Sequence, residues 1–440
     1  MLRPCLFALA LATAGLPCAP LAAQPDAERP APAPQTALEQ RSEQVVAVLR
    51  GEQAPEDLFS KEFLAAVPAA QLKALNASLA SQFGEAVEVT KLDPREGTSA
   101  ILEIRFERGL AKGPIVLDPA QDNRVSGLRF TQIEPLAVAD DTPARITADL
   151  AALPGSVNAW FAPLDGGAPV ISLGADQPLA LGSAFKLYVL AALAEDVKVG
   201  RRKWSDVVPL TEKSYPSGQL QDWPKGAPVT LHTLASLMIA ISDNTATDQL
   251  ITVLGKKRIL KLMKESGHHN PALNTPFLTT RELFLLKASD DMTISSWRSG
   301  SVTERAATTA ANVAESMVEP VPLEDVNAAF GNGPKAIDIE WFASPADLAR
   351  LFAHMRRTAD PGAFDILAIN PSANGETIRA SWPYIGFKGG SEPGVLNYTW
   401  LLTDTAGRDW VLTLGWNNPE AVLDEGKLNA IAQRILLLPR

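Results

Sequence analysis

Apolar residues recur at helical spacing early in the chain and then alternate as they do in strands. Residues 37–49 and 63–83 have the helical period, and the second stretch repeats Leu72, Leu75 and Leu79 on one face. Alternation then predicts four strands, separated by turn residues, at 87–89, 99–106, 113–117 and 125–133. Helices followed by an antiparallel meander predict a small α+β domain over residues 37–136, in which a curved sheet packs on helices.

A second, larger set of elements follows residues 137–143, which we interpret as a linker. Its expected elements are a helix at 146–153, strands at 157–163 and 170–173, a helix from Ser183, strands at 384–387, 398–403 and 410–416, and a closing helix at 421–438. This order predicts a second α+β domain over residues 144–440, with an antiparallel sheet between helical layers. Residues 288–334 are expected to be an extra helical segment, either at the site entrance or on the surface.

Composition adds to this picture. A chain of 440 residues is longer than one ordinary core needs, and 46% hydrophobic with 20% charged residues is typical of globular domains. A net charge of −10 argues against nucleic acid or anionic lipid as the main partner. Residues 24–36 are rich in Pro and Ala and are interpreted as a linker.

Residues 1–23 have the pattern of a secretory signal peptide. Arg3 precedes an apolar run at 6–16, and the small residues at 21–23 offer a cleavage site. The run is shorter than the roughly 20 residues of a membrane helix, so we expect an exported protein, periplasmic or secreted, without a stable membrane span in the mature form. An uncleaved anchor is the alternative. Both cysteines, Cys5 and Cys18, lie in this segment.

Three short strings occur in one order, and they are Ser183-Ala184-Phe185-Lys186, Ser242-Asp243-Asn244 and Lys388-Gly389-Gly390-Ser391. Ser183 begins a predicted helix, where free backbone N–H groups favour a developing negative charge. Lys186 follows on the same face, within reach of the serine hydroxyl, and a buried lysine can act as a base. Each string alone is also compatible with a cap, a polar turn or a solvated lysine.

Together the strings resemble the Ser-x-x-Lys, Ser-Asp-Asn and Lys-Thr-Gly set of class A β-lactamases and penicillin-binding proteins. The similarity covers roughly residues 146–272 and 381–438. It implies an acyl-enzyme mechanism that needs no metal or cofactor, with Ser183 as nucleophile, Lys186 as base and Ser242 as proton relay. The remaining implied site residues are Lys388, which attracts a substrate carboxylate, Asn244, which binds the substrate amide, Gly390, which allows close approach, and Ser391, which completes the oxyanion hole with Ser183.

Two positions depart from the family pattern. Gly389 stands where the family has a hydroxyl residue, so one carboxylate contact is lost unless Ser391 supplies it. Asn270 stands where class A enzymes carry the glutamate that activates the deacylating water. Because an amide cannot accept that proton, we expect slow hydrolysis of the acyl-enzyme unless another base serves. The nearby candidates for such a base are His268, His269 and Glu282.

The two-domain organisation, the Lys-Gly-Gly-Ser-Glu-Pro-Gly string at 388–394 and the missing glutamate resemble most closely the two-domain β-lactamase-like protein of clavulanic acid biosynthesis clusters. The helices and antiparallel meander of the N-terminal domain resemble the cone of nuclear transport factors and ketosteroid isomerases, so this domain is expected to be cystatin-like. We find no catalytic constellation in it and expect a structural or partner-binding role.

We therefore expect an exported serine hydrolase of the β-lactamase-like family that acts on β-lactams or on related amides and esters. One alternative is an esterase or peptidase for other acyl groups, based on Gly389 and on Val207, where the family often has an aromatic gate. The other is a β-lactam-binding sensor that is acylated without turnover, based on Asn270. The physiological substrate and the oligomeric state stay open.

Overall fold

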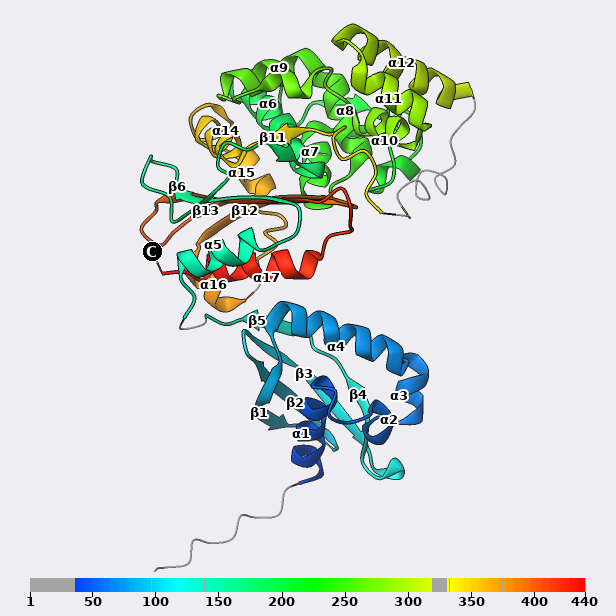
Figure 1. Ribbon diagram of the computed structural model, residues 1–440, viewed down its shortest axis with the longest axis vertical. Coiled ribbons are helices and arrows are strands. Elements are labelled where there is room, and N and C mark those ends of the chain that lie inside the picture. The colour runs from blue at the N-terminus through cyan, green and yellow to red at the C-terminus, as the bar shows by residue number, and fades with distance from the viewer. Residues whose placement is uncertain are drawn as a thin grey trace, which may run out of the picture.

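The computed structural model of the chain describes residues 36–95, 97–137, 140–318, 331, 333–373 and 375–439. This part has the predicted α+β class, with helices packed against two larger antiparallel sheets of five strands each (Figure 1). The expected signal peptide at 1–23 and all but the last residue of the expected linker lie outside the described residues. No helix in the described ranges has both the length and the apolar character that crossing a membrane requires.

The N-terminal part is a curved antiparallel meander with helices packed against it (Figure 1). Strands β1 to β4 pair in sequence order, and β5 pairs with β3. In β2 the residues alternate between half-buried and buried, so one face of the strand fills the core. The bounds are α1 (Ala37–Leu49), α2 (Pro55–Leu58), α3 (Lys61–Ala66), α4 (Ala69–Phe83), β1 (Ala86–Pro94), β2 (Ser99–Phe106), β3 (Gly109–Asp118), β4 (Arg124–Leu128) and β5 (Gln132–Pro135). Its likeness to the cystatin-like cone stays a prediction.

The single helix expected over 63–83 is wrong, because the structure has two helices there. Pro68 separates α3 from α4 and is the N-cap residue of α4. Proline has no N–H for the helical ladder, and its ring clashes with the carbonyl four residues earlier. The apolar periodicity continued across this break, which is why the pattern alone suggested one helix.

The C-terminal part is a sheet of order β12-β13-β14-β6-β7 between two helical layers (Figure 1). Helices α5, α16 and α17 cover one face, and the larger helical layer with α6, α14 and α15 covers the other. The bounds are α5 (Pro143–Ala151), β6 (Ser156–Pro163), β7 (Ile171–Leu173), α6 (Lys186–Lys198), α14 (Pro345–Thr358), α15 (Gly362–Leu367), α16 (Glu376–Ser381), β12 (Tyr384–Glu392), β13 (Val395–Thr403), β14 (Asp409–Asn417) and α17 (Glu425–Leu436).

Helix α6 is the centre of the larger helical layer. Ten of its 13 residues are buried, which fits a helix that is apolar on nearly all sides. The neighbouring helices are α7 (Leu231–Ala240), α8 (Asn244–Leu254) and α9 (Lys256–Glu265). The expected extra segment is helical, with α10 (Thr280–Ala288) leading into α11 (Asp291–Ser299) and α12 (Val302–Val318), while 319–330 lie outside the described residues.

Polar contacts join the two parts beside α17. Ser81 Oγ of α4 donates a hydrogen bond to Asp424 Oδ2 at 3.1 Å, just before α17 begins. Thr377 of α16 donates from both its backbone N and its Oγ1 to Glu134 Oε1 at 3.0 Å. The C-terminal end of α4 therefore lies against the N-terminal end of α17.

Candidate active site

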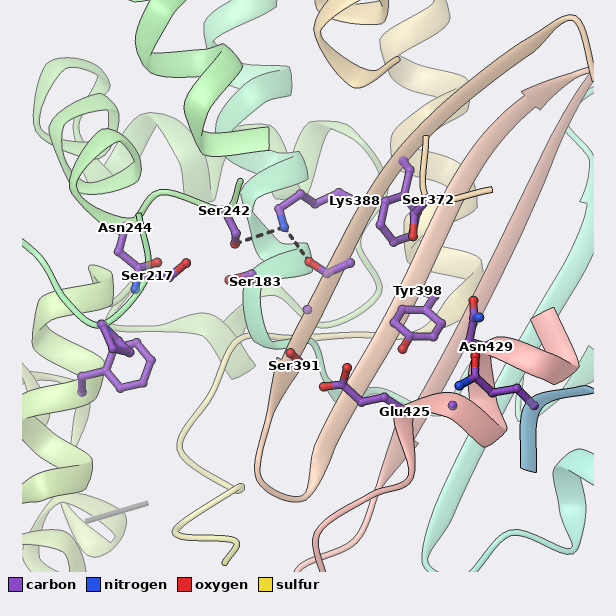
Figure 2. A pocket seen from close by; sticks show the side chains of 17 residues that line it. Ser183, Ser217, Ser242, Asn244, Ser372, Lys388, Ser391, Tyr398, Glu425 and Asn429 are labelled. Atoms are coloured by element: carbon purple, nitrogen blue, oxygen red, sulfur yellow. Dashed lines mark hydrogen bonds between the residues drawn. The ribbon is translucent and has the colours of Figure 1, made fainter. Parts of the chain in front are cut away.

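Ser183 lies in a 3₁₀ turn, η2 (Gly182–Phe185), that runs directly into α6. Its half-buried side chain lines a cavity of about 660 Å³ (Figure 2). The buried helix behind it fixes the position of the turn, while its hydroxyl stays accessible from the cavity. A serine at the start of a helix, open to a pocket, has the placement that a nucleophile needs.

Lys186 is fully buried at the start of α6. Its Nζ donates to the Ser242 carbonyl at 2.7 Å, to Ser242 Oγ at 3.0 Å and to Asn244 Oδ1 at 2.7 Å. Burial, and secondly the positive charge of Lys388, hold the pKa of Lys186 well below its usual value, although Asp248 and Asp243 oppose this. The lowered pKa makes Lys186 a better proton acceptor than an ordinary lysine.

The sequence placed the Lys186 amine within reach of the Ser183 hydroxyl. In the described part of the chain, no hydrogen bond joins Ser183 Oγ to Lys186 Nζ, because the amine is directed toward Ser242 and Asn244. Catalytic hydrogen bonds are often long in an unliganded site and tighten when substrate binds.

Ser242 lies in the turn between α7 and α8 with a φ of 60°, which is unusual for a residue with a side chain. Asp243 holds this turn in place by accepting from the backbone N of Ala246 at 2.8 Å, of Gln219 at 2.8 Å and of Leu220 at 3.0 Å. Asp243 is thus the N-cap of α8 and has a structural role. The strained backbone is compensated by these bonds, and it directs Ser242 Oγ between two lysines.

Lys388 approaches Ser242 from β12. Its Nζ donates to Ser242 Oγ at 3.2 Å and to the Gly389 carbonyl at 2.6 Å (Figure 2). Burial lowers the pKa of Lys388 to about 7. The hydroxyl of Ser242 is therefore a hydrogen-bonded bridge between two desolvated amines.

The glycines of β12 are explained by close packing. A Cβ atom at Gly390 would lie 2.0 Å from the Leu181 carbonyl oxygen and 2.6 Å from the backbone N of Ser183, so the strand can approach η2 only without a side chain. A Cβ at Gly389 would lie 2.8 Å from Cζ of Phe387. The Phe387 ring thus occupies space that a hydroxyl residue at 389 would need.

Asn244 and Ser391 also line the cavity. The Asn244 amide is already bonded on both sides, since Oδ1 accepts from Lys186 and Nδ2 donates to the Tyr215 carbonyl at 3.2 Å. Ser391 is exposed at the end of β12, beside the turn that holds Ser183. All seven residues selected from the sequence are therefore gathered around one cavity, with Lys186 directly beneath its wall.

The residues expected to replace the family's glutamate as deacylating base do not line the cavity. Asn270 and His269 are exposed, and neither is among the residues that line the cavity. His268 is buried, with Nε2 2.8 Å from the Phe342 carbonyl and Nδ1 accepting from the Asn270 backbone. Glu282 caps α10 in a capping box with Thr279 and binds Lys256 at 2.6 Å. Structural contacts engage both His268 and Glu282.

Sequence reasoning missed several residues of the cavity wall. Glu425 and Asn429 come from α17 and Tyr398 from β13 (Figure 2). Gln82 comes from α4 of the N-terminal part. Tyr398 lies opposite Gly389 on the neighbouring strand. Because cross-strand partners lie side by side, the position of Gly389 in the site also indicated, indirectly, the position of Tyr398. Val207, which stands where the family often has an aromatic gate, is exposed on β9 (Val207–Pro209) and does not line the cavity.

A family model and several solved structures are similar to this chain. A family model described as the beta-lactamase enzyme family matches residues 142–435. Among solved structures, the chain is similar to a beta-lactamase from Sphaerobacter thermophilus, with 22% identity, 68% of this chain and 98% of that chain covered, and a TM-score of 0.46. It is also similar to a PBP-A mutant solved as an acyl-enzyme complex with penicillin G, with 18% identity, 67% and 94% coverage and a TM-score of 0.45. No curated protein matches the chain.

Proposed function

The chain belongs to the beta-lactamase enzyme family, and from that premise we propose that it is a serine hydrolase that forms an acyl-enzyme through Ser183. Its proposed substrates are β-lactams or related amides and esters. The observation that carries this proposal is the bridge of Ser242 Oγ between the buried amines of Lys186 and Lys388, beside an accessible serine. Closeness to the branch from clavulanic acid clusters stays a prediction.

In the proposed acylation, the Ser183 oxygen attacks the substrate carbonyl carbon and its proton passes to Lys186. The C–N bond of a lactam or amide, or the C–O bond of an ester, then breaks. The leaving atom takes a proton through Ser242, which is 3.0 Å from Lys186 Nζ. Lys388 supplies positive charge for a substrate carboxylate, and the backbone N–H groups of Ser183 and Ser391 stabilise the oxyanion.

Deacylation is the weak step in this proposal. Asn270 replaces the family's glutamate and lies outside the cavity, while His268 and Glu282 are engaged in structural contacts. Among the described residues, Glu425 is the one carboxylate that lines the cavity, and it is not at the position of the family's glutamate. We therefore infer that acylation is faster than hydrolysis, so that an acyl adduct accumulates.

Intact-protein mass spectrometry tests the proposal directly. The mature protein is mixed with a penicillin and with a cephalosporin, and its mass is followed over time. Wild type should gain the mass of one acyl group, and Ser183→Ala should gain none. Ser217→Ala is the matched control, because Ser217 also lines the cavity but has no proposed covalent role. An adduct of equal yield on Ser183→Ala would disprove the nucleophile assignment.

Two other functions are favoured by specific observations. The missing hydroxyl at Gly389 and the Phe387 ring beside it favour an esterase or peptidase for other acyl groups, which would hydrolyse aryl esters without forming a lactam adduct. The position of Asn270 outside the cavity favours a β-lactam sensor, in which the adduct would persist without product. The same time course separates the three, because a transient adduct with product identifies a hydrolase of lactams.

We also propose that the protein is exported, on the basis of the signal-peptide pattern at 1–23. Expression of the whole chain in a bacterial host, followed by cell fractionation, tests this. The periplasmic or secreted protein should begin at Gln24, and an intact N-terminus in the membrane fraction would identify an uncleaved anchor instead.

A further inference from the structure

Three cavities follow one another from Ser183 into the N-terminal part. The catalytic cavity shares Gln82 and Asn429 with a second cavity of about 770 Å³, which lies between α4, β5, α16 and α17. The second cavity in turn shares Leu75, Leu79 and Phe130 with a third of about 280 Å³ inside the N-terminal part. Cavities that share lining residues are neighbours. We call this series of three cavities the path, and its two ends differ in chemistry.

The far end of this path is apolar. Among the residues that line the third cavity, Val45, Phe59 and Leu79 belong to the buried core of the N-terminal part. Protein interiors are normally close-packed, and empty cavities of this size are rare and unfavourable. A cavity with apolar walls stays dry but accepts apolar molecules that fit it. Its size and lining therefore suit an alkyl or aryl group.

Helix α4 forms the wall that links the cavities. Leu75, Ser78 and Gln82 follow one another at spacings of three and four residues, so they lie on one face of the helix. At 1.5 Å per residue, the step from Gln82 to Leu75 is roughly 10 Å along the helix axis. Leu75 is 49% exposed, although it is a large apolar side chain, because it lies where the second and third cavities meet.

We propose that the substrate has a long apolar tail, and that this tail runs from the catalytic cavity past Gln82 and over Leu75 into the apolar cavity of the N-terminal part. The occupant is an amide, lactam or ester whose acyl group or side chain is an extended alkyl or aryl chain. This inference rests on the proposed function of Ser183 for the reacting head group. It assigns to the N-terminal part the selection of the tail.

The test is a chain-length series at the reaction centre. Penicillins with butanoyl, octanoyl and decanoyl side chains are compared by the second-order rate constant of Ser183 acylation, measured by intact mass. Each methylene that enters the path should raise this constant about fourfold. Leu75→Glu should lower the ratio of the decanoyl to the butanoyl rate constant toward one. Ala77→Glu is the control, since Ala77 is exposed on the same helix and lines none of the three cavities.

A second measurement does not depend on catalysis. Ser183→Ala is titrated with a fluorescent long-chain fatty acid, with and without Leu75→Glu, and binding is followed by the emission of the probe. Saturable binding that Leu75→Glu weakens at least tenfold, and Ala77→Glu does not, supports the apolar site even if no penicillin acylates the protein. Acylation that is independent of chain length, together with probe binding that Leu75→Glu does not alter, would overturn the inference while leaving the nucleophile in place.

Discussion

A buried cluster of charged residues at the end of β12 should make the free energy of unfolding depend on pH. Lys287 of α10 is fully buried and donates to Glu340 Oε1 at 2.9 Å and to Glu392, the last residue of β12. Burial alone would lower the pKa of Lys287, but the two carboxylates raise it overall. Burial is the main reason why the pKa of Glu392 is raised to about 8, and the neighbouring Glu340 carboxylate adds to this effect. Lys287 opposes it by lowering the pKa of Glu392.

The sign of the effect follows from proton binding. In the folded protein Glu392 keeps its proton up to about pH 8, whereas in the unfolded chain it loses the proton near its ordinary value of 4.5. Between these values the folded state binds one more proton, so the free energy of unfolding falls as pH rises. The slope for one proton is roughly 1 kcal/mol per pH unit, which amounts to several kcal/mol over the whole window.

Glu392→Gln removes this titration while keeping the size of the side chain. Unfolding in urea is followed by tryptophan fluorescence, which reports on the C-terminal part because all nine tryptophans lie between Trp160 and Trp416. From about pH 5 to about pH 8, wild type should lose roughly 1 kcal/mol per pH unit more than Glu392→Gln. Glu420→Gln, an exposed carboxylate, should follow wild type. Parallel pH profiles for wild type and Glu392→Gln would refute this reasoning.

Three further predictions concern the site itself. Because the pKa of Lys388 is about 7, this residue loses its positive charge above pH 7. The rate of acylation by a penicillin, which carries a carboxylate, should therefore decrease above pH 7, while the rate of acylation by a neutral ester should not. Coincident pH profiles of the two rates above pH 7 would exclude Lys388 as the carboxylate site. Gly389→Thr should lower stability by about 1–3 kcal/mol, since its Cβ would meet Phe387, and the added change Phe387→Leu should recover most of this loss in thermal unfolding. Asn270→Glu should leave the lifetime of the acyl adduct unchanged, because position 270 is outside the cavity; a shorter lifetime in the mass time course would show that this loop reaches Ser183.

The residues that sequence reasoning found share a local signature. Ser183 and Lys186 are separated by less than one helical turn, and Lys388 is two residues from Gly390 on one strand. Such short spacings follow directly from helix and strand geometry, so the pattern can be read without a fold. The antiparallel sheet could also be predicted, because its strands alternate or are continuously apolar between turn residues.

What the sequence did not predict depends on long-range packing. The amine of Lys186 is directed by Ser242 and Asn244, which lie at the junction between α7 and α8, more than 50 positions away in the sequence. Asn270 is followed by Pro271 and Asn274, as the family's glutamate is followed by a proline and an asparagine, yet the loop exposes Asn270 to solvent. Gln82 has no motif at all, since it reaches the cavity only because α4 meets α17. Local spacing carries no information about such contacts.

The contact between α4 and α17 makes the N-terminal part a wall of the active site. Gln82 lines the catalytic cavity, and a Cβ at Gly426 would lie 3.0 Å from Gln82 Cγ, so the two helices touch beside the pocket. The polar bonds that join the parts here, from Ser81 and from Thr377, are exposed, and bonds of this kind contribute only about 1 kcal/mol each. These bonds therefore contribute little to the placement of Gln82, which depends on the packing of α4 against α17. Occupation of the path by the proposed substrate tail would add contacts to both α4 and α17, so binding of the tail would also stabilise the packing of the N-terminal part beside the catalytic cavity.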